Sequence, residues 1–253
     1  MGNPPPPKWM DESKRIIDAA RDVGATLRLI GGLGVRSHCN ELKFCDREHG
    51  DIDLAGLSRD SDEIIEILQS MGYRERRTVT FASGGNRLLF ENTQIGNHVD
   101  IFLDKLRMEH EIDLKERLKT NEYTVSVSDL LLGKLIIYHL TEKDYRDIFT
   151  LLKDLQIGES DEENMLNLRY LASLCAKDWG LYVDVLASIE KCKSFLPNYE
   201  MEKTDREDVE KKLNLLEKRI KTAPKSIRWR IRAFLGNKLP VRRKVEEENL
   251  KSE

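Results

Sequence analysis

Two aspartates placed two positions apart, Asp51 and Asp53, carry the clearest chemical signal in the chain. Residues i and i+2 of a β-strand point to the same face, so the two carboxylates would lie side by side while Ile52 and Leu54 face the core. Like charges that close need a proton or a cation between them, and carboxylates together with substrate phosphates are the usual ligands of Mg²⁺. The spacing predicts a metal site, although such a triplet also occurs in turns and on exposed surfaces.

A glycine pair and a third aspartate could complete a site that handles phosphates. Gly31 and Gly32 follow a short apolar strand at the expected start of a helix, where free N–H groups favour a phosphate and glycine allows close approach. A simple tight turn would explain the same pair. Asp100 lies in the strand-like run 98–103, where Val99 and Ile101 face one way and Asp100 the other. An acidic residue within an apolar strand requires a partner.

The elements that would position these residues follow from hydrophobic periodicity and turn residues. A first helix is expected at 11–23, then a strand at 27–30, the glycine turn and a helix at 33–39. A further helix would begin near Ser61, and Gly84-Gly85 would form a hairpin turn. The remaining strands are expected at 51–55, 73–81, 86–91, 98–103 and 123–127. After Ser128, a good helix cap, only helices are expected, at 129–140, 143–156, 162–177, 181–195, 205–222 and 225–235.

Three motifs, residues 29–36, 47–54 and 98–101, resemble in order and spacing those of the DNA polymerase beta-like nucleotidyltransferase superfamily. The resemblance implies that Asp51 and Asp53 bind two Mg²⁺ ions. It also implies that Asp100 binds one of these ions and helps to activate the attacking hydroxyl. Gly31 and Gly32 would hold the nucleoside triphosphate (NTP). The implied reaction transfers a nucleoside monophosphate to a hydroxyl group and releases pyrophosphate, with two metals stabilising the attacking and leaving oxygens.

A second resemblance covers the start of the helical half. Residues 132–135 and 145–152 are similar to the lysine helix and the Arg-Asp helix of the abortive-infection type IV toxin nucleotidyltransferases. It implies that Lys134 reaches a phosphate and that Arg146 or Asp147 orients the nucleotide, and it raises the possibility of an RNA or tRNA acceptor and an antitoxin partner. The chain departs from that family at Thr150, where a second aspartate is usual. The exposed faces of amphipathic helices would also account for Lys134 and Arg146.

The run from Arg47 to Asp53 also resembles small-molecule nucleotidyltransferases that adenylylate antibiotics, in which an Arg and a His precede the paired acids. This resemblance draws attention to Arg47 and His49 and favours a small hydroxylated acceptor, with a protein hydroxyl as a related possibility. Arg36, one turn into the helix after the glycines, could contact a phosphate or lie on the surface. An inactive nucleotide-binding module is the third alternative, and the intact acids weigh against it.

Charge is unevenly distributed. The chain has a formal net charge of −3, yet residues 218–244 hold eleven Lys and Arg and no acidic residue, so the rest of the chain is acidic. A basic helix around Trp229, with Arg228, Arg230 and Arg232, could bind RNA phosphates and stack a base. It could also lie on an anionic membrane or cover the acidic body of the protein.

Composition restricts the class of protein. Hydrophobic residues make up 40% and charged residues 34% of the 253 residues. The chain contains no apolar run long enough to span a membrane and no evident signal peptide, so we expect no membrane insertion and a cytoplasmic location. The four cysteines form no CxxC pair, which favours reduced, mostly packed thiols over a disulfide framework or a zinc site. They are Cys39, Cys45, Cys175 and Cys192.

The expected fold class is α+β. A flexible Pro-rich leader would cover residues 1–10, and residues 11–128 would form a nucleotidyltransferase-like catalytic domain with a mixed sheet flanked by helices. Residues 129–253 would form a helical bundle that carries the basic segment 218–244. No Gly/Ser-rich linker separates the halves, so they are expected to pack together.

Overall fold

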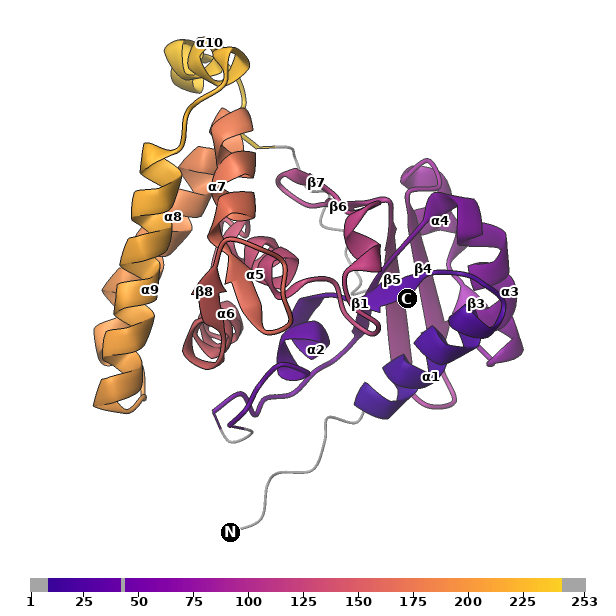
Figure 1. The fold of residues 1–253 in the computed structure, drawn as a ribbon. Helices are drawn as coiled ribbons and strands as arrows, with labels where there is room; N and C mark the ends of the chain where they lie inside the picture. The colour runs from indigo at the N-terminus through magenta and orange to yellow at the C-terminus, as the bar shows by residue number, and fades with distance from the viewer. Residues whose placement is uncertain (1–8, 42–43, 243–253) are drawn as a thin grey trace.

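The computed structural model describes residues 9–41 and 44–242 (Figure 1). Most of the expected leader, residues 1–8, lies outside the described part, as do Arg243 and Lys244 of the basic segment. Trp9 and Met10 belong to the packed body, because both side chains are buried in the same core as helix α1 (Met10–Asp22). The expected leader boundary at residue 10 is therefore wrong for Trp9 and Met10, which are packed residues.

A five-stranded mixed sheet organises the first half of the chain. Its strand order is β1-β2-β5-β4-β3, in which β2 and β5 are parallel and the other neighbours are antiparallel. The register pairs Asp53 of β2 with Asp100 of β5. The strands are β1 (Leu27–Leu29), β2 (Ile52–Gly56), β3 (Arg74–Glu75), β4 (Arg87–Asn92) and β5 (Asn97–Leu103).

The two faces of this sheet have different roles. Helices α1 and α3 (Ser61–Ser70) contribute apolar side chains to one cluster with the inward residues of β2 and β5, such as Leu54 and Ile101. Strand alternation turns Asp53 and Asp100 away from that cluster. On their side lie α2 (Gly31–Arg36), the hairpin of β6 (Lys105–Arg107) and β7 (Glu111–Asp113), and α5 (Val127–Leu135). The apolar cluster thus supports the strands, and the other face carries the polar groups.

Helices dominate the second half and share a core with the first. The larger hydrophobic cluster runs from Ile30, Val35 and Ala55 to Ile220 without a break at residue 128. The halves are therefore packed together, while the domain boundary at 128 stays a prediction. The helices after α5 are α6 (Glu142–Asp154), α7 (Leu168–Lys177), α8 (Trp179–Phe195), α9 (Lys203–Thr222) and α10 (Ile227–Leu235). No described helix combines the length and apolarity needed to cross a membrane.

The predicted α+β class, a mixed sheet followed by a helical part, is confirmed. The strand predicted at 73–81 is wrong beyond its first residues: β3 is followed by helix α4 (Arg77–Ala82). Alternating Thr and Val favoured a strand, yet of the helix residues only Val79 is buried and Phe81 is 79% exposed. Because so little of the segment packs against the sheet, its sequence alternation does not specify strand pairing.

The region around residue 128 also differs in detail. The expected strand 123–127 is reduced to one bridge between Leu29 and Thr124. Helix α5 begins at Val127 because Ser126, rather than Ser128, caps it by accepting a hydrogen bond from the Asp129 N–H. The second half is not helices alone, because a parallel pair of short strands, β8 (Gln156–Gly158) and β9 (Met165–Asn167), precedes α7.

The expectation of four reduced thiols is wrong for one pair. Cys39 and Cys45 form a disulfide that closes the short segment between α2 and β2. Their separation of six residues does not match the CxxC spacing, so the sequence rule missed it. Cys175 and Cys192 are buried free thiols within the helical core, as expected.

Candidate functional site

The glycine turn and Asp53 fit together closely. Gly31 has a positive φ of 61°, and a Cβ at this position would overlap Asp53 Oδ2. The Ile30 N–H donates to the Asp53 carbonyl oxygen at 3.0 Å, which ties the turn to β2. A Cβ at Gly32 would overlap the Arg47 guanidinium in the same way. The glycine pair predicted to hold the triphosphate therefore also makes room for Asp53 and Arg47.

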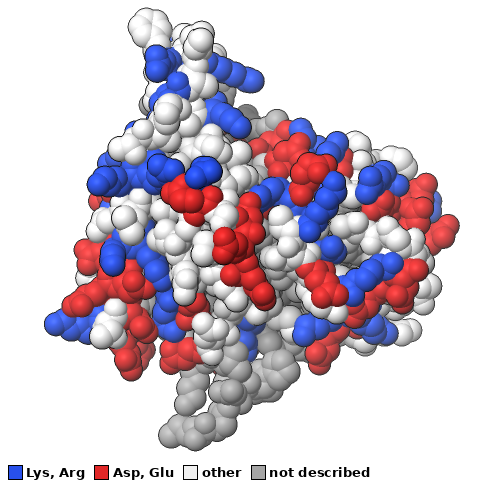
Figure 2. All heavy atoms as spheres, viewed as in Figure 1, with Lys and Arg blue, Asp and Glu red and all other residues white. Residues whose placement is uncertain are grey.

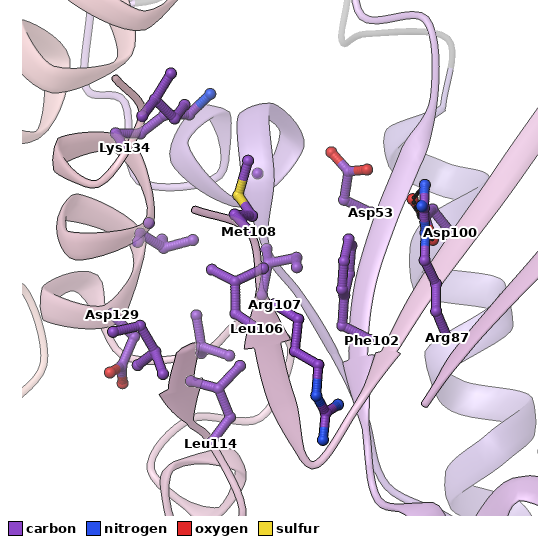
Figure 3. A pocket seen from close by; sticks show the side chains of 17 residues that line it. Asp53, Arg87, Asp100, Phe102, Leu106, Arg107, Met108, Leu114, Asp129 and Lys134 are labelled. Carbon is purple, nitrogen blue, oxygen red and sulfur yellow. Dashed lines mark hydrogen bonds and ion pairs between the residues drawn. The ribbon is translucent and has the colours of Figure 1, made fainter. Parts of the chain in front are cut away.

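Asp53 and Asp100 form the acidic centre of the site. They are register partners on parallel strands (Figure 3). Both side chains are partly buried. No hydrogen bond or ion pair reaches the Asp53 carboxylate within the described part of the chain. Burial, together with the neighbouring Asp100 charge, raises the pKa of Asp53 to about 6, and Asp51 adds to the rise. A cation placed here would remove that repulsion.

Arg87, which was not selected from the sequence, forms an ion pair with the Asp100 carboxylate. Its Nε donates to Asp100 Oδ1 at 2.8 Å and its second terminal nitrogen donates to Oδ2 at 2.7 Å. Arg87 starts β4 and lies opposite Phe102, so it is the diagonal neighbour of Asp100 on the same face of the sheet. The alternation of the two strands would have indicated this pair, but only if their register were known.

Asp51 stands at the edge of this centre. It immediately precedes β2, its side chain is mostly exposed, and its nearest partner is His98 Nδ1, 3.6 Å from Oδ1. Among the described residues, no group of three His, Cys, Asp or Glu side chains is arranged to hold a metal ion. The carboxylates of Asp53 and Asp100 nevertheless suit a hard cation, because burial and then the neighbouring Asp100 charge raise the pKa of Asp53, and a bound cation would offset both.

A buried ion-pair network from the helical half borders the acidic centre. Lys134 of α5 lies 3.2 Å from Asp144 Oδ1 and 2.8 Å from Asp147 Oδ2 of α6. Arg47 binds the same Asp147 carboxylate through two nitrogens, at 3.1 and 2.8 Å. Despite its burial, the pKa of Lys134 is raised, because Asp147 and Asp144 favour its charged form. The network holds two cations beside the glycine turn.

His49 and Arg36, two more residues selected from the sequence, lie near the glycine turn. Burial, followed by the Arg47 charge, lowers the pKa of His49 to about 4, so this imidazole is neutral at physiological pH. Arg36 is buried, and burial lowers the pKa of its guanidinium. His49 Nε2 and Arg36 Nε are both buried without a hydrogen-bond partner in the described structure. The region around the glycine turn and α2 therefore contains polar atoms for which no described residue provides a hydrogen-bond partner.

The acidic centre opens into a cavity of about 310 Å³ between the sheet and α5 (Figure 3). Asp53, Arg87, Asp100 and Lys134 line one part of it. The β6–β7 hairpin and α5 supply mostly apolar walls elsewhere. The apolar lining residues are Ile30, Phe102, Leu106, Met108, Ile112, Leu114, Val125, Leu130 and Ile137. Arg107 and Asp129 also line the cavity, and Asp129 is paired with Arg117 at 2.8 Å.

Other sequence-selected groups lie elsewhere. Arg146 is directed away from the cavity: it donates to the Asp46 carbonyl at 2.7 Å and to Glu142 at 3.1 Å, while its neighbour Asp147 faces Lys134. Trp229 of the basic segment packs edge to face against Tyr182, with ring centroids 5.2 Å apart. The site thus contains Asp53, Asp100, Gly31, Lys134 and Asp147, with Asp51 at its margin.

Comparison with solved structures gives distant neighbours. A lincosamide antibiotic adenylyltransferase, LnuA bound to lincomycin, aligns with 55% of this chain and 92% of its own, at 21% identity and a TM-score of 0.40. The antibiotic-resistance factor ANT(2'')-Ia aligns with 55% of this chain and 80% of its own, at 13% identity and a TM-score of 0.39. No family model matches the chain. No curated protein matches it either.

Proposed function

We propose that this protein is a nucleotidyltransferase that transfers a nucleoside monophosphate from an NTP to the hydroxyl of a small molecule. The observation that carries the proposal is the register pairing of Asp53 with Asp100, which both line a largely apolar cavity. The glycine turn against Asp53 and the Lys134–Asp147 pair beside it agree with that assignment. The similarity of the motifs to nucleotidyltransferases supports the same reaction class.

Asp53 and Asp100, with Asp51 at the margin, would hold Mg²⁺. The bound metal would neutralise charge that develops on the phosphate during an in-line displacement. In that displacement the acceptor oxygen forms a bond to the α phosphorus, the bond from the α phosphorus to the bridging oxygen breaks, and pyrophosphate leaves. The hydroxyl proton passes to a carboxylate of the Asp53–Asp100 pair.

The cationic groups would position the NTP. Lys134 lines the cavity, and Arg47 lies against Gly32 at the glycine turn, so both can face a triphosphate held there. Because Asp144 and Asp147 already neutralise much of this charge, the network would bind phosphate mainly through directed N–H groups. Gly31 and Gly32 allow the phosphate chain to approach the backbone.

A small acceptor fits the cavity better than RNA does. A volume of about 310 Å³ with apolar walls matches a drug-sized molecule rather than a polyanionic strand. The basic segment adds little support for RNA, because Trp229, the ring expected to stack a base, faces Tyr182 instead. We therefore propose neither a toxin-like transfer to RNA nor an antitoxin partner.

The test incubates the purified protein and MgCl₂ with each α-labelled NTP, adding a low-molecular-mass metabolite extract to one set and total RNA to the other. We expect label in a small product, no labelled RNA, and no product with Asp53→Asn. Met108→Trp, which fills the cavity, should reduce transfer, whereas Phe81→Trp on exposed α4 should not. Labelled RNA with wild-type protein, or full transfer by Asp53→Asn, would contradict the proposal.

A further inference from the structure

Helix α10 exposes an apolar stripe that no described residue covers. Ile227, Ile231 and Phe234 are 77%, 60% and 90% exposed. At 100° per residue these three side chains fall within an arc of about 60° on one face of the helix. The helix forms a projection beyond α7, α8 and α9 (Figure 1). Large apolar side chains clustered on a projection indicate an interaction surface.

Packing on the opposite face fixes the direction of this stripe. Trp229 packs against Tyr182, and the Lys225 ammonium lies 4.8 Å from the centre of the Tyr182 ring. Arg232 stacks over Trp179 at 4.6 Å and also donates to the Leu239 and Pro240 carbonyls. After the helix, the chain is anchored where Arg242 binds Asp184 at 2.8 and 2.5 Å. The helix is thus held to the body by one face, and the apolar stripe points outward.

Charge along α10 itself is of one sign, and the nearest acidic residue in the surrounding hollow is Asp178, which lines it together with Ile227 and Ile231. Arg228 and Arg230 are exposed and flank it on its two sides, and residues 218–242 contain no acidic residue. In Figure 2 the projection carries only blue and white spheres, whereas the body below mixes red and blue. A helix with an apolar face bordered by cations is the pattern of segments that lie in the interface of an anionic bilayer.

We propose that α10 docks this protein on the surface of an anionic lipid bilayer, with Ile227, Ile231 and Phe234 among the lipid chains and Arg228 and Arg230 at the headgroups. A second copy packed symmetrically on the stripe would bring the same arginines together, which repulsion opposes. RNA binding would use arginines and several aromatic rings, but Phe234 is the one exposed ring among the described residues of α10, and Trp229 packs against Tyr182. The bilayer satisfies both the apolar and the cationic groups.

The experiment is sedimentation of the full chain with phosphatidylcholine vesicles, with and without phosphatidylglycerol, at low and high salt. We expect binding only to vesicles that contain phosphatidylglycerol, and weaker binding at high salt. The double variant Ile231→Glu with Phe234→Glu should lower the partition coefficient at least about tenfold, and Arg228→Gln with Arg230→Gln should also lower it. Phe81→Glu on α4, equally exposed but outside the basic segment, serves as the matched control and should bind like wild type.

Several results would overturn the proposal. One is the absence of sedimentation with phosphatidylglycerol vesicles, and another is binding that Ile231→Glu with Phe234→Glu leaves intact. A concentration-dependent dimer abolished by the same double variant would assign the stripe to a second copy. RNA binding lost only in the arginine variant would assign the helix to nucleic acid. Circular-dichroism melting of each variant would establish that the fold is retained, since α10 contributes no residue to the continuous hydrophobic core.

Discussion

Arg87 and Asp100 form a two-point ion pair at the position where the resemblance to nucleotidyltransferases implies a metal ligand. The Arg87 Nε and a terminal nitrogen hold both carboxylate oxygens, and the guanidinium lies 5.4 Å from the Phe102 ring centre. Among the described residues, no Lys or Arg forms such an ion pair with Asp53, the register partner of Asp100. The two carboxylates of the site are therefore unequal: the Asp100 carboxylate is paired with a guanidinium, whereas the Asp53 carboxylate is paired with no described side chain.

This inequality predicts the effect of Arg87→Met. Because a divalent cation must compete with the guanidinium for Asp100, removing it should raise the affinity for Mn²⁺ or Mg²⁺ about tenfold, equivalent to roughly 1.4 kcal/mol. Titration of Mn²⁺ followed by electron paramagnetic resonance measures the change. Arg74→Met, at an exposed pair with Glu91 on the neighbouring strand edge, is the control. Unchanged or weaker metal binding in Arg87→Met would show that Arg87 does not compete for the site.

Asp53→Asn should separate stability from activity. The folded-state pKa of Asp53, about 6, lies above its usual value, so between about pH 4 and pH 6 the folded state binds more protons than the unfolded state. Stability then falls as the pH rises through this window, and the cost persists at neutral pH. Without divalent ions, Asp53→Asn should be more stable than wild type at pH 7 by about 1 to 3 kcal/mol, with little difference at pH 4.

Urea unfolding of wild type and Asp53→Asn at several pH values measures that difference. The lowered pKa of His49 gives stability the opposite pH dependence, but this contribution is the same in both proteins and cancels in the comparison. Added Mg²⁺ should stabilise wild type and not the variant. Transfer activity of the variant should fall by about two orders of magnitude or more. A variant less stable than wild type at pH 7 would show that Asp53 is compensated by groups other than a metal.

Gly31→Ala tests the fit between the turn and Asp53. Gly31 and Gly24 both have positive φ, 61° and 82°, but an added Cβ meets Asp53 only at Gly31 and meets nothing within 4 Å at Gly24. Gly24→Ala should therefore cost only the backbone term of about 1 kcal/mol and keep full activity. Gly31→Ala should cost more and lose transfer activity. Thermal unfolding and the labelled-NTP assay give both readouts, and equal effects of the two variants would refute the close fit.

Substitutions of Lys134 and Arg146 are expected to have different effects, although the same family resemblance suggested both residues. Lys134→Met leaves the buried Asp144 and Asp147 with less compensation and should destabilise the fold by about 3 kcal/mol. It should also weaken NTP binding. Arg146→Met should cost at most about 1 kcal/mol and leave NTP affinity unchanged, because that side chain points away from the cavity. Fluorescent-nucleotide titration distinguishes them, and an NTP defect confined to Arg146→Met would reverse the assignment.

Local patterns in the sequence predicted the two strands that carry the aspartates of the candidate site. The alternation of apolar and polar residues placed Asp53 and Asp100 on the faces of β2 and β5 opposite the apolar residues, because period-two alternation is a property of each strand by itself. Helix periodicity likewise predicted α6 and α8. Where packing is slight, as in α4, the same alternation was misleading.

Only the tertiary structure decided what these residues meet. Strand register made Asp53 and Asp100 partners and brought Arg87 to Asp100, and the packing of α6 against α5 turned Asp147 to Lys134 while directing Arg146 away. The Cys39–Cys45 disulfide and the outward stripe of α10 were decided at the same level. Short-range periodicity in the sequence indicates which face of a helix or strand is buried. The pairings between these residues depend instead on how elements distant in the sequence pack together, which the spacing of neighbouring residues does not specify.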